Sequence, residues 1–497
     1  MRIKNYDMLT NHGNLEGRKI LADIMEAGLS AADPYANTLA LVRREGAKLI
    51  FEGLEFEPKG DPRSGPAIYN LDEIDRVFVF GVGKGIQRIT KALEDVLGDY
   101  LTDGHVVAKH GDDVIMERMG VTLAGHPVPD IHCVVGNQKI LDIITEAKLT
   151  ENDLVITAIG NGVSALMTLP WVGIPIEDVT EATRLMQIEY GVNTGELNQI
   201  RVSVDQLKGG RISRLIHPAK MVHIVGVAPT PMGFIATSNI SEFEALVKRN
   251  GWLHTLCVTT TYTAALKVIE KYDTAGKMPK TIVDFLTNYD SSQDAVRWDE
   301  FDTFDYRVFG VMPKSRTSLA IGMQRAEALG YTPHFVATVV TDAAPAGAYM
   351  SRIARAIEQG LSSFKAPCAL FTDGELIVAC GENPGIGGTN QEYCLAASRA
   401  IAGSKRIVVA GSDTDGTDGP GGEFHPDATA LGITCLTGGI VDGYTSAELD
   451  AKGVDVHKAL LNHATSEPLW IVGSGIAAVQ NISVGDYACT IVMDHDG

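Results

Sequence analysis

The sequence lacks paired cysteine motifs, and this excludes two classes of protein. Its seven cysteines are odd in number and widely separated, and no two of them form a Cys-x-x-Cys pair. Such usage is typical of a reduced intracellular protein in which Cys is a small apolar residue, so a disulfide framework and a zinc knuckle are both excluded. The His-Glu-x-x-His motif is absent as well, and the sequence therefore gives no support to zinc chemistry.

The sequence also lacks a long apolar run and an excess of positive charge. No stretch approaches the roughly 18 apolar residues of a membrane span, and residues 1–19 lack the apolar core of a signal peptide. We therefore expect a soluble, cytoplasmic protein. Lys and Arg number 42 against 62 Asp and Glu, a formal charge of −20. That balance argues against nucleic acid or an anionic membrane as the main partner, but a small anionic substrate needs only a few local cations.

The composition is otherwise that of a globular protein, and 497 residues allow two or three domains at roughly 150 residues each. Helix and strand signals alternate along the chain. Residues 14–50 have helical spacing, and short apolar runs that indicate strands follow at 76–80, 154–159 and 221–227. The first two runs end in glycine turns that lead into helices at about 88–97 and from 164 onward.

Short apolar strands that end in Gly-rich turns favour an α/β fold with a mostly parallel sheet and helices on both faces. Ligands in such sheets bind outside the carboxyl ends of the strands. Residues 233–305 are more polar, and we interpret them as helical excursions and a domain connection. A second α/β block is expected from Tyr306, with strands at 307–311 and 334–340, a helix at 318–329 and a strand at 407–410.

Three segments favour the binding of an anion. Gly81-Val-Gly-Lys-Gly85 follows a strand, so its backbone can approach a ligand at a helix start beside Lys84. It matches neither the P-loop nor the dinucleotide fingerprint, and a tight turn with a solvated lysine is the alternative. Gly160-Asn-Gly-Val-Ser164 has the same design, although Ser164 can simply cap its helix. Arg201, Lys208 and Arg211 suggest a carboxylate or phosphate pocket, or else a solvated helix end.

Two further segments could contribute chemistry. Asp413, Asp415 and Asp418 follow the strand at 407–410, and three carboxylates there suit a hard cation such as Mg²⁺ or a general base. A plain polar turn is the alternative. His126 lies in the proline-flanked loop Gly125-His-Pro-Val-Pro-Asp130, where a lone histidine is more often structural than catalytic.

Taken in order, eight motifs resemble those of the class II glycerate 2-kinase family, two-domain proteins whose C-terminal part is called the MOFRL domain. The motifs are Gly81-Val-Gly-Lys-Gly85, Thr102-Asp-Gly104, Ala124-Gly-His-Pro-Val-Pro-Asp130, Gly160-Asn-Gly-Val-Ser-Ala-Leu166 with Pro170, Leu197-Asn-Gln-Ile-Arg201 with Leu207-Lys-Gly-Gly-Arg211, Asp373-Gly-Glu375, Gly387-Gly-Thr-Asn-Gln-Glu392 and Asp415-Gly-Thr-Asp-Gly-Pro420. The resemblance covers most of residues 15–230 and 306–490.

The resemblance implies phosphorylation of a hydroxyl of glycerate or a related small hydroxy or sugar acid, with ATP and Mg²⁺, in a cleft between a Rossmann-like and a MOFRL-like domain. It implies domains at 1–300, with an insertion at about 231–257, and 301–497. The implied catalytic residues are Lys84, Asp415 and Arg201. The implied substrate-binding residues are His126, Asn161, Ser164, Lys208, Arg211 and Glu392. Those implied for the nucleotide are Gly81, Gly83, Gly85, Gly387, Gly388 and Asn390, and those for the metal are Asp415 and Asp418.

Several family motifs are altered in this chain. Thr389 occupies the place of an arginine, and Gly473-Ser-Gly-Ile-Ala-Ala-Val479 replaces a Gly-Pro-Thr-Gly-Thr-Asn-Val pattern. Because such groups would hold phosphates, a non-kinase enzyme (a lyase, isomerase or hydrolase) for a polyhydroxy or keto acid is an alternative hypothesis. A protein that binds without catalysing is a third. A homodimer is possible, and the sequence does not determine the oligomeric state.

Overall fold

The computed structural model of the chain describes residues 1–227, 240–381, 383–479 and 485–494. The chain divides into two compact units. The central unit comprises residues 33–314, and the terminal unit comprises residues 1–32 together with 315–497. The expected division at 300/301 is therefore wrong in one important respect, because the N-terminal segment belongs with the C-terminal half of the chain.

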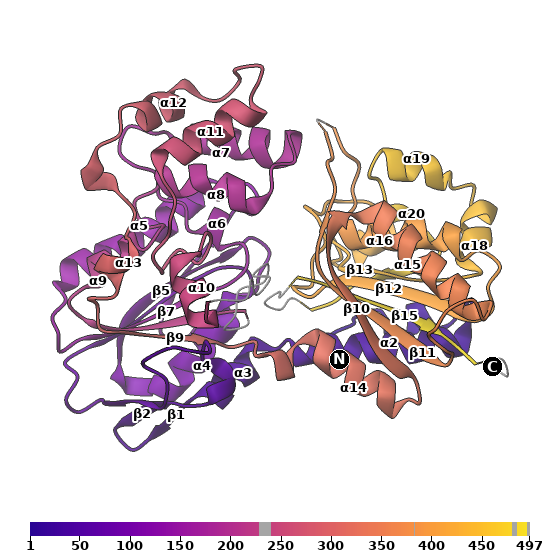
Figure 1. Cartoon of the computed structure of the whole chain (residues 1–497), viewed down its shortest axis with the longest axis horizontal. Coiled ribbons are helices and arrows are strands. Elements are labelled where there is room, and N and C mark those ends of the chain that lie inside the picture. The colour runs from indigo at the N-terminus through magenta and orange to yellow at the C-terminus, as the bar shows by residue number, and fades with distance from the viewer. Residues whose placement is uncertain (228–239, 382, 480–484, 495–497) are drawn as a thin grey trace. The chain divides into compact units, whose positions relative to one another are not determined.

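The central unit is built on a sheet of six parallel strands in the order β6-β5-β4-β7-β8-β9. Strands β5, β7 and β9 of this sheet are labelled in Figure 1. The strands are β4 (Val77–Val82), β5 (Leu101–Lys109), β6 (Gly120–Ala124), β7 (Leu154–Ile159), β8 (Lys220–Val225) and β9 (Tyr306–Gly310). β4 and β7 are buried along their whole length, as expected for strands covered on both faces. The strand order reverses between β4 and β7, which is the topological switch point at which such sheets bind ligands.

Helices cover this sheet and extend beyond it. They include α3 (Pro34–Leu41), α4 (Ile86–Leu97), α5 (Ile131–Ala147), α6 (Val163–Leu166), α9 (Arg211–Ile216), α10 (Glu242–Lys248) and α13 (Trp298–Phe301). Five more segments share a separate apolar core at the top of the unit in Figure 1: α7 (Ile176–Thr183), the π-helical turn η3 (Arg184–Glu189), α8 (Thr194–Ser203), α11 (Tyr262–Tyr272) and α12 (Lys280–Thr287). This helical group supports the residues that follow β7.

Three expectations for this part of the chain need correction. Residues 42–51 are not helical, because Gly46 takes a φ of +61° and turns the chain into the hairpin β1 (Val42–Glu45) and β2 (Lys48–Phe51), joined by β3 (Ala67–Asn70). The strand at 306–310 does not open the second block, since it pairs with β8 as the edge of the central sheet. The expected insertion at about 231–257 lies partly outside the described residues. Its described remainder does not form a domain connection, because Leu253 and Leu256 pack into the core of the central unit.

The terminal unit contains a mixed six-stranded sheet in the order β10-β11-β15-β12-β13-β14, in which only β10 and β11 are parallel. Its strands are β10 (Thr332–Asp342), β11 (Cys368–Ile377), β12 (Ile407–Asp413), β13 (Gly438–Asp442), β14 (Gly475–Ile476) and β15 (Asp486–Val492). The last strand in sequence, β15, lies in the middle of the sheet, so this unit is completed only by the end of the chain.

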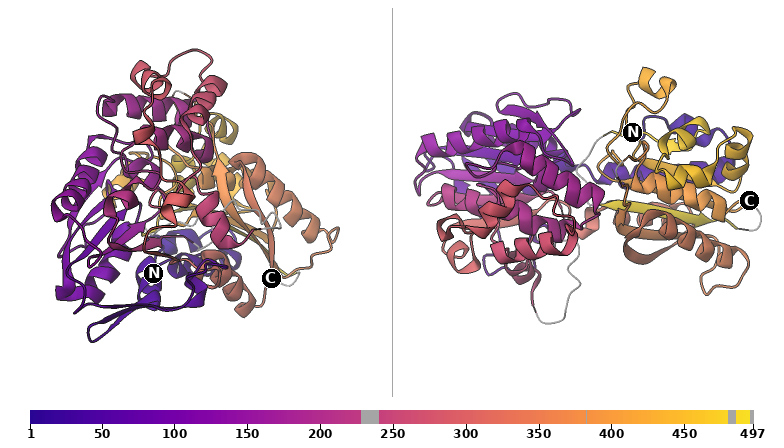
Figure 2. Two further views of the ribbon diagram at one scale, coloured as in Figure 1. Left: turned by 60° about the vertical axis from the view of Figure 1, so that its left-hand side comes forward. Right: turned by 90° about the horizontal axis from the view of Figure 1, so that it is seen from above.

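Both faces of the terminal sheet are covered. Ile407 and Val409 of β12 face a core formed with α15 (Ala343–Glu358) and α16 (Thr389–Ala400), whereas Val408 and Ala410 face a second core. That second core contains Leu21 and Ile24 of α2 (Leu15–Ala31), with α14 (Ser318–Ala328) alongside (Figure 2). The remaining helices are α1 (Tyr6–Thr10), α17 (Pro426–Ala430), α18 (Thr445–Ala451), α19 (Val456–Leu461) and α20 (Ser466–Ile471).

A buried ion pair fixes the N-terminal segment to this sheet. Arg18 Nε of α2 donates to Asp442 Oδ2 of β13 at 2.5 Å, and both side chains are fully buried. The same guanidinium donates to the hydroxyls of Thr445 and Ser474. These contacts, together with the apolar face of α2, explain why residues 1–32 belong to the terminal unit.

Two expectations from composition can be compared with the structure. All seven cysteines are free thiols, and five of them are buried, in agreement with their expected role as small apolar residues. Within the part of the chain that the structure describes, none of the helices combines the length and the apolarity that crossing a bilayer requires.

Candidate functional site

Two glycine turns meet at the switch point of the central sheet. The turn after β4 and the turn after β7 touch, since the Lys84 amide donates to the Asn161 carbonyl oxygen at 2.8 Å. A Cβ added at Gly83, whose φ is +150°, would lie 2.7 Å from the Gly160 nitrogen. Only glycine permits this approach. The two predicted anion-binding turns, containing Gly81, Gly83, Gly85 and Asn161, are therefore adjacent, as a ligand site requires.

The loop that carries His126 joins the same place. A Cβ at Gly162 would lie 2.8 Å from His126 Cδ2 and 2.9 Å from Lys84 Cγ, so these two side chains flank the turn after β7. Burial, and then the positive charges of Lys84 and Lys109, hold the pKa of His126 well below its usual value. His126 is therefore a neutral imidazole at pH 7, able to accept a hydrogen bond.

Arg201 of α8 contributes a buried positive charge to this region. Its Nη2 donates to Gln187 Oε1 of η3 at 2.8 Å, and the residue is 6% exposed. Burial lowers the pKa of Arg201 to about 10, and its charge in turn lowers the pKa values of His126 and His254. None of the described carboxylates lies within ion-pair distance of this guanidinium.

Several polar atoms around Arg201 are buried without a hydrogen-bond partner among the described residues. They are Arg201 Nε, His254 Nδ1 and both side-chain amide atoms of Asn198, which lies one turn before Arg201 on α8. His254 is held from its other side, because its Nε2 lies 2.9 Å from Ser164 Oγ. Since native structures rarely leave buried polar groups unpaired, this group is expected to hydrogen-bond to a ligand or ordered water.

The other two predicted cations have different roles. Lys208 Nζ donates to Asp205 Oδ2 at 2.7 Å and to Thr168 Oγ1 at 3.1 Å, and both members of the ion pair are about 1% exposed. Arg211 donates to the carbonyl oxygens of Gln293, Val202 and Lys208. Lys208 and Arg211 therefore hold the connection between α8 and α9 in place, and of the three predicted cations only Arg201 keeps a buried nitrogen without a hydrogen-bond partner among the described residues.

The acidic loop of the terminal unit is likewise only partly as expected. The Asp418 carboxylate accepts from the amides of Asn390 and Gln391 and from Thr389 Oγ1, which ties it to the first turn of α16. Asp415 Oδ1 accepts from the amide and the hydroxyl of Thr417, at 2.7 and 2.8 Å. Of the predicted metal pair, Asp418 is therefore hydrogen-bonded to α16, and Oδ1 of Asp415 is hydrogen-bonded to its own loop.

A different pair of carboxylates lies at the same end of the sheet. Asp413 of β12 is directly opposite Asp486 of β15 in the antiparallel register. Burial, and then the charge of Asp413, hold the pKa of Asp486 well above its usual value, which means that the ionised pair is strained. Asn390 Nδ2 donates to Asp486 Oδ1. Asp486 is distant in the chain from the acidic loop, so the sequence pattern does not predict this pair.

The predicted nucleotide residues of α16 pack within their own unit. A Cβ at Gly388 would lie 2.2 Å from the Asp418 carbonyl oxygen, and one at Gly387 would lie 2.4 Å from Thr465 Oγ1. These glycines therefore permit close packing, and the capping carboxylate of Asp418 already takes the first amides of the helix. Glu392 Oε2 lies 2.9 Å from His463 Nδ1, and burial raises its pKa.

Comparison with known proteins identifies the family. Residues 20–238 match the model described as "Domain of unknown function (DUF4147)", and residues 368–479 match the MOFRL family. The chain is 32% identical over 462 residues to a glycerate 2-kinase of Pyrococcus horikoshii, which covers 91% of this chain and 94% of that protein. It is 29% identical over 398 residues to a D-glycerate 2-kinase of Thermotoga maritima, covering 78% and 84% respectively.

A solved structure agrees with this assignment. A crystal structure of a protein from Pyrococcus horikoshii matches 96% of this chain and 98% of its own length, with a TM-score of 0.64 and 28% identity. The alignment with a glycerate 2-kinase thus extends over nearly the whole chain. It includes the switch-point turns, the buried arginine of α8 and most of the mixed sheet of the terminal unit. The chain belongs to the class II glycerate 2-kinase family and is a glycerate kinase-like enzyme.

Proposed function

We propose that the protein transfers a phosphoryl group from ATP to a hydroxyl of glycerate or a related small hydroxy acid. The observation that carries this proposal is Arg201, a buried guanidinium near neutral histidines at the switch point, with no carboxylate partner among the described residues. A buried charge without a counter-ion is costly, so its presence is explained best by an anionic substrate that supplies the counter-charge. Asn198, with both amide atoms unpaired, adds a second group for the same carboxylate.

The phosphate side of the reaction fits the other turn. Phosphoryl transfer needs positive charge and oriented N–H groups around the phosphates and little covalent chemistry from the protein. Lys84 and the amides at the start of α4 are of that kind, because they follow a β strand at the switch point. His126, neutral and beside Lys84, is suited to accept a hydrogen bond from the substrate hydroxyl.

The terminal unit offers a fit for Mg²⁺. Two carboxylates opposite each other on neighbouring strands repel, and a divalent cation would relieve that repulsion between Asp413 and Asp486. Mg²⁺ usually binds one or two carboxylates and completes its shell with water and phosphate oxygens, so two residues suffice. A bound Mg²⁺ would supply positive charge to any phosphate oxygen that coordinates it. Asp413 and Asp486 would hold it, with Asp415 nearby in sequence.

The direct test is ADP release from Mg-ATP with a panel of C3 to C6 hydroxy acids, with the phosphorylated carbon identified by NMR. We expect glycerate to be a substrate. Arg201→Met should abolish saturation by glycerate, whereas Lys267→Met, which removes an exposed cation of α11, should leave the kinetics unchanged. Absence of ADP with every acid would refute the proposal.

One observation favours a second candidate, a non-kinase enzyme for a hydroxy or keto acid. Ser164 Oγ and His254 Nε2 lie 2.9 Å apart, the distance between a nucleophile and its base. Thermal-shift measurements separate the two hypotheses. Stabilisation by glycerate but by neither ATP nor ADP would favour this candidate, and stabilisation by both ligands would favour the kinase.

A further inference from the structure

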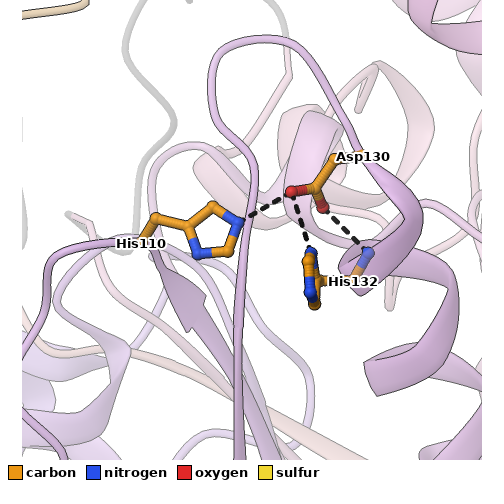
Figure 3. A group of neighbouring side chains, drawn as sticks. All are labelled: His110, Asp130 and His132. Atoms are coloured by element: carbon orange, nitrogen blue, oxygen red, sulfur yellow. Dashed lines mark hydrogen bonds and ion pairs between the residues drawn. The ribbon is translucent and has the colours of Figure 1, made fainter.

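A second group of ligand-type side chains lies at the start of α5, apart from Lys84 and Arg201. His110 follows β5, and Asp130 and His132 are at the N-terminus of α5 (Figure 3). His110 Nε2 lies 2.7 Å and His132 Nδ1 lies 3.2 Å from the same atom, Asp130 Oδ2. All three potential ligand atoms are within 4.8 Å of one another, and no other described residues form such a group of three.

The three ligand atoms lie close enough together for a small rearrangement to form the first coordination shell of a metal ion. Zinc binds histidine nitrogen and carboxylate oxygen at about 2.0–2.2 Å, which places tetrahedral ligand atoms about 3.3 Å apart. The 3.2 Å between His132 Nδ1 and Asp130 Oδ2 is close to this value, whereas the 2.7 Å between His110 Nε2 and Asp130 Oδ2 is a hydrogen-bond length and would have to widen by about 0.6 Å. The two histidine side chains are about half exposed, at 48% and 54%, so modest rotations would open the space for an ion.

The backbone orients the carboxylate for this role. Asp130 Oδ1 accepts hydrogen bonds from the amides of Gly125, His132 and Cys133, which leaves Oδ2 directed at the two rings. Burial would raise the pKa of Asp130, but the hydrogen bonds from His110, these amides and His132 outweigh it and lower the pKa to about 2. An ionised carboxylate with one fixed oxygen is the kind of ligand that outer hydrogen bonds normally prepare.

We propose that His110, Asp130 and His132 form a binding site for a divalent metal of the zinc type, with at least one coordination position open to solvent. Two imidazoles and one carboxylate select a borderline metal such as Zn²⁺ over Mg²⁺, which prefers oxygen ligands alone. Asp130 also supplies the negative charge that makes a cation acceptable at the positive end of α5. The spacing of these residues in sequence did not suggest a metal site, because His110 lies on a different strand connection.

The ion would act on the loop that carries His126. Asp130 Oδ1 closes this loop through the Gly125 amide, while Oδ2 faces the proposed metal. A bound ion would hold Asp130 and thereby restrict the segment between Gly125 and Asp130. The proposal concerns binding at this site and does not depend on which reaction the protein catalyses.

The test is a titration of chelator-treated, tag-free protein with Zn²⁺ in competition with a chromophoric chelator. We expect one tight equivalent per chain, and tetrahedral visible absorption when Co²⁺ replaces Zn²⁺. Loss of an outer-shell partner alone costs roughly 10–100-fold in affinity, so His110→Gln and His132→Gln should each weaken binding by at least about tenfold. Asp130 is left intact because it caps α5.

His457→Gln is the matched control, because His457 is an exposed histidine of α19 in the other unit. It should bind Zn²⁺ like the unaltered protein. Two results would overturn the proposal. One is the absence of a stoichiometric equivalent at micromolar Zn²⁺, and the other is unchanged affinity in the double variant His110→Gln, His132→Gln. Both readouts are binding measurements, so their failure is distinguishable from a failure of the proposed kinase activity.

Discussion

Ser164 Oγ lies 2.9 Å from His254 Nε2, although 90 positions separate the two residues in the chain. The contact joins the turn after β7 to the segment that follows α10, and it brings His254 into the neighbourhood of Arg201. The segment expected to be an insertion thus provides part of the wall around the candidate site.

Removing this contact should cost stability. In Ser164→Ala, His254 would lose its one described side-chain partner while staying fully buried. A buried polar group left unpaired costs about 1–3 kcal/mol, so we expect a loss of that size in the free energy of unfolding. Urea unfolding measures it. Ser164→Cys keeps a weak donor and should lose less, and equal losses in both variants would contradict the role of the hydrogen bond.

Substituting Arg201 should abolish activity without lowering the stability of the protein. Arg201→Met removes a buried charge that has no described carboxylate partner and replaces it with an apolar chain of similar length. Because burying a charge without a counter-ion is costly, removing this charge should not destabilise the fold. We expect an unchanged or higher Tm together with loss of glycerate-dependent ADP release. A large drop in Tm would instead assign Arg201 a structural role.

The buried histidine of β8 should make stability depend on pH. His223 is fully buried against Phe301, and its Nδ1 lies 2.7 Å from Thr157 Oγ1. Burial lowers the pKa of His223 to about 3, below the value of about 6.5 in the unfolded chain. At pH values between about 3 and 6.5, His223 is protonated in the unfolded state but neutral in the folded state. The free energy of unfolding therefore falls as the pH drops below about 6.5.

The expected slope from this one residue is about 1.4 kcal/mol per pH unit. The measurement is the urea midpoint of unfolding at several pH values between 4 and 7. His223→Gln should flatten the dependence, whatever it does to stability at pH 7, whereas the exposed-site variant His457→Gln should keep the original slope. An unchanged slope in His223→Gln would show that other groups dominate.

The buried pair of the terminal unit should be sensitive to single substitutions. Arg18→Met leaves Asp442 as a buried carboxylate without its cation, and breaking such a pair typically costs about 3–5 kcal/mol. The double variant Arg18→Met, Asp442→Leu removes both charges and should recover much of that loss. Thermal melts of the single and double variants test this, and a single variant as stable as the parent protein would contradict it.

Parts of the fold could be predicted from sequence for a clear reason. Strands β4, β7 and β8 are buried on both faces, so they appear as largely apolar runs, and the glycines that follow β4 and β7 mark close turns. The sequence pattern predicts a helix at the hairpin of residues 42–51, because the apolar residues there also fit a helical period. Strand β9 was assigned to the wrong sheet because an isolated apolar run does not indicate its partner.

The site was only partly predictable, because the role of a charged residue depends on its partner. Asp205 lies three positions before Lys208, and that spacing could have indicated the ion pair that occupies the lysine. No comparable local signal exists for Asp486, which meets Asp413 only through strand pairing, or for His254. The unpaired atoms of Asn198 become visible only when the surrounding groups are counted.

The position of α2 also bears on how the protein is synthesised. During translation this helix emerges among the first residues, but the strand against which it packs, β15, is made last. The apolar face of α2 therefore lacks its packing partner while the whole central unit is synthesised and folds. During that time it is prone to aggregation unless another surface covers it. A circular permutant that links the two ends through a flexible linker and opens the chain near residue 314 would turn two interleaved folding units into two consecutive ones.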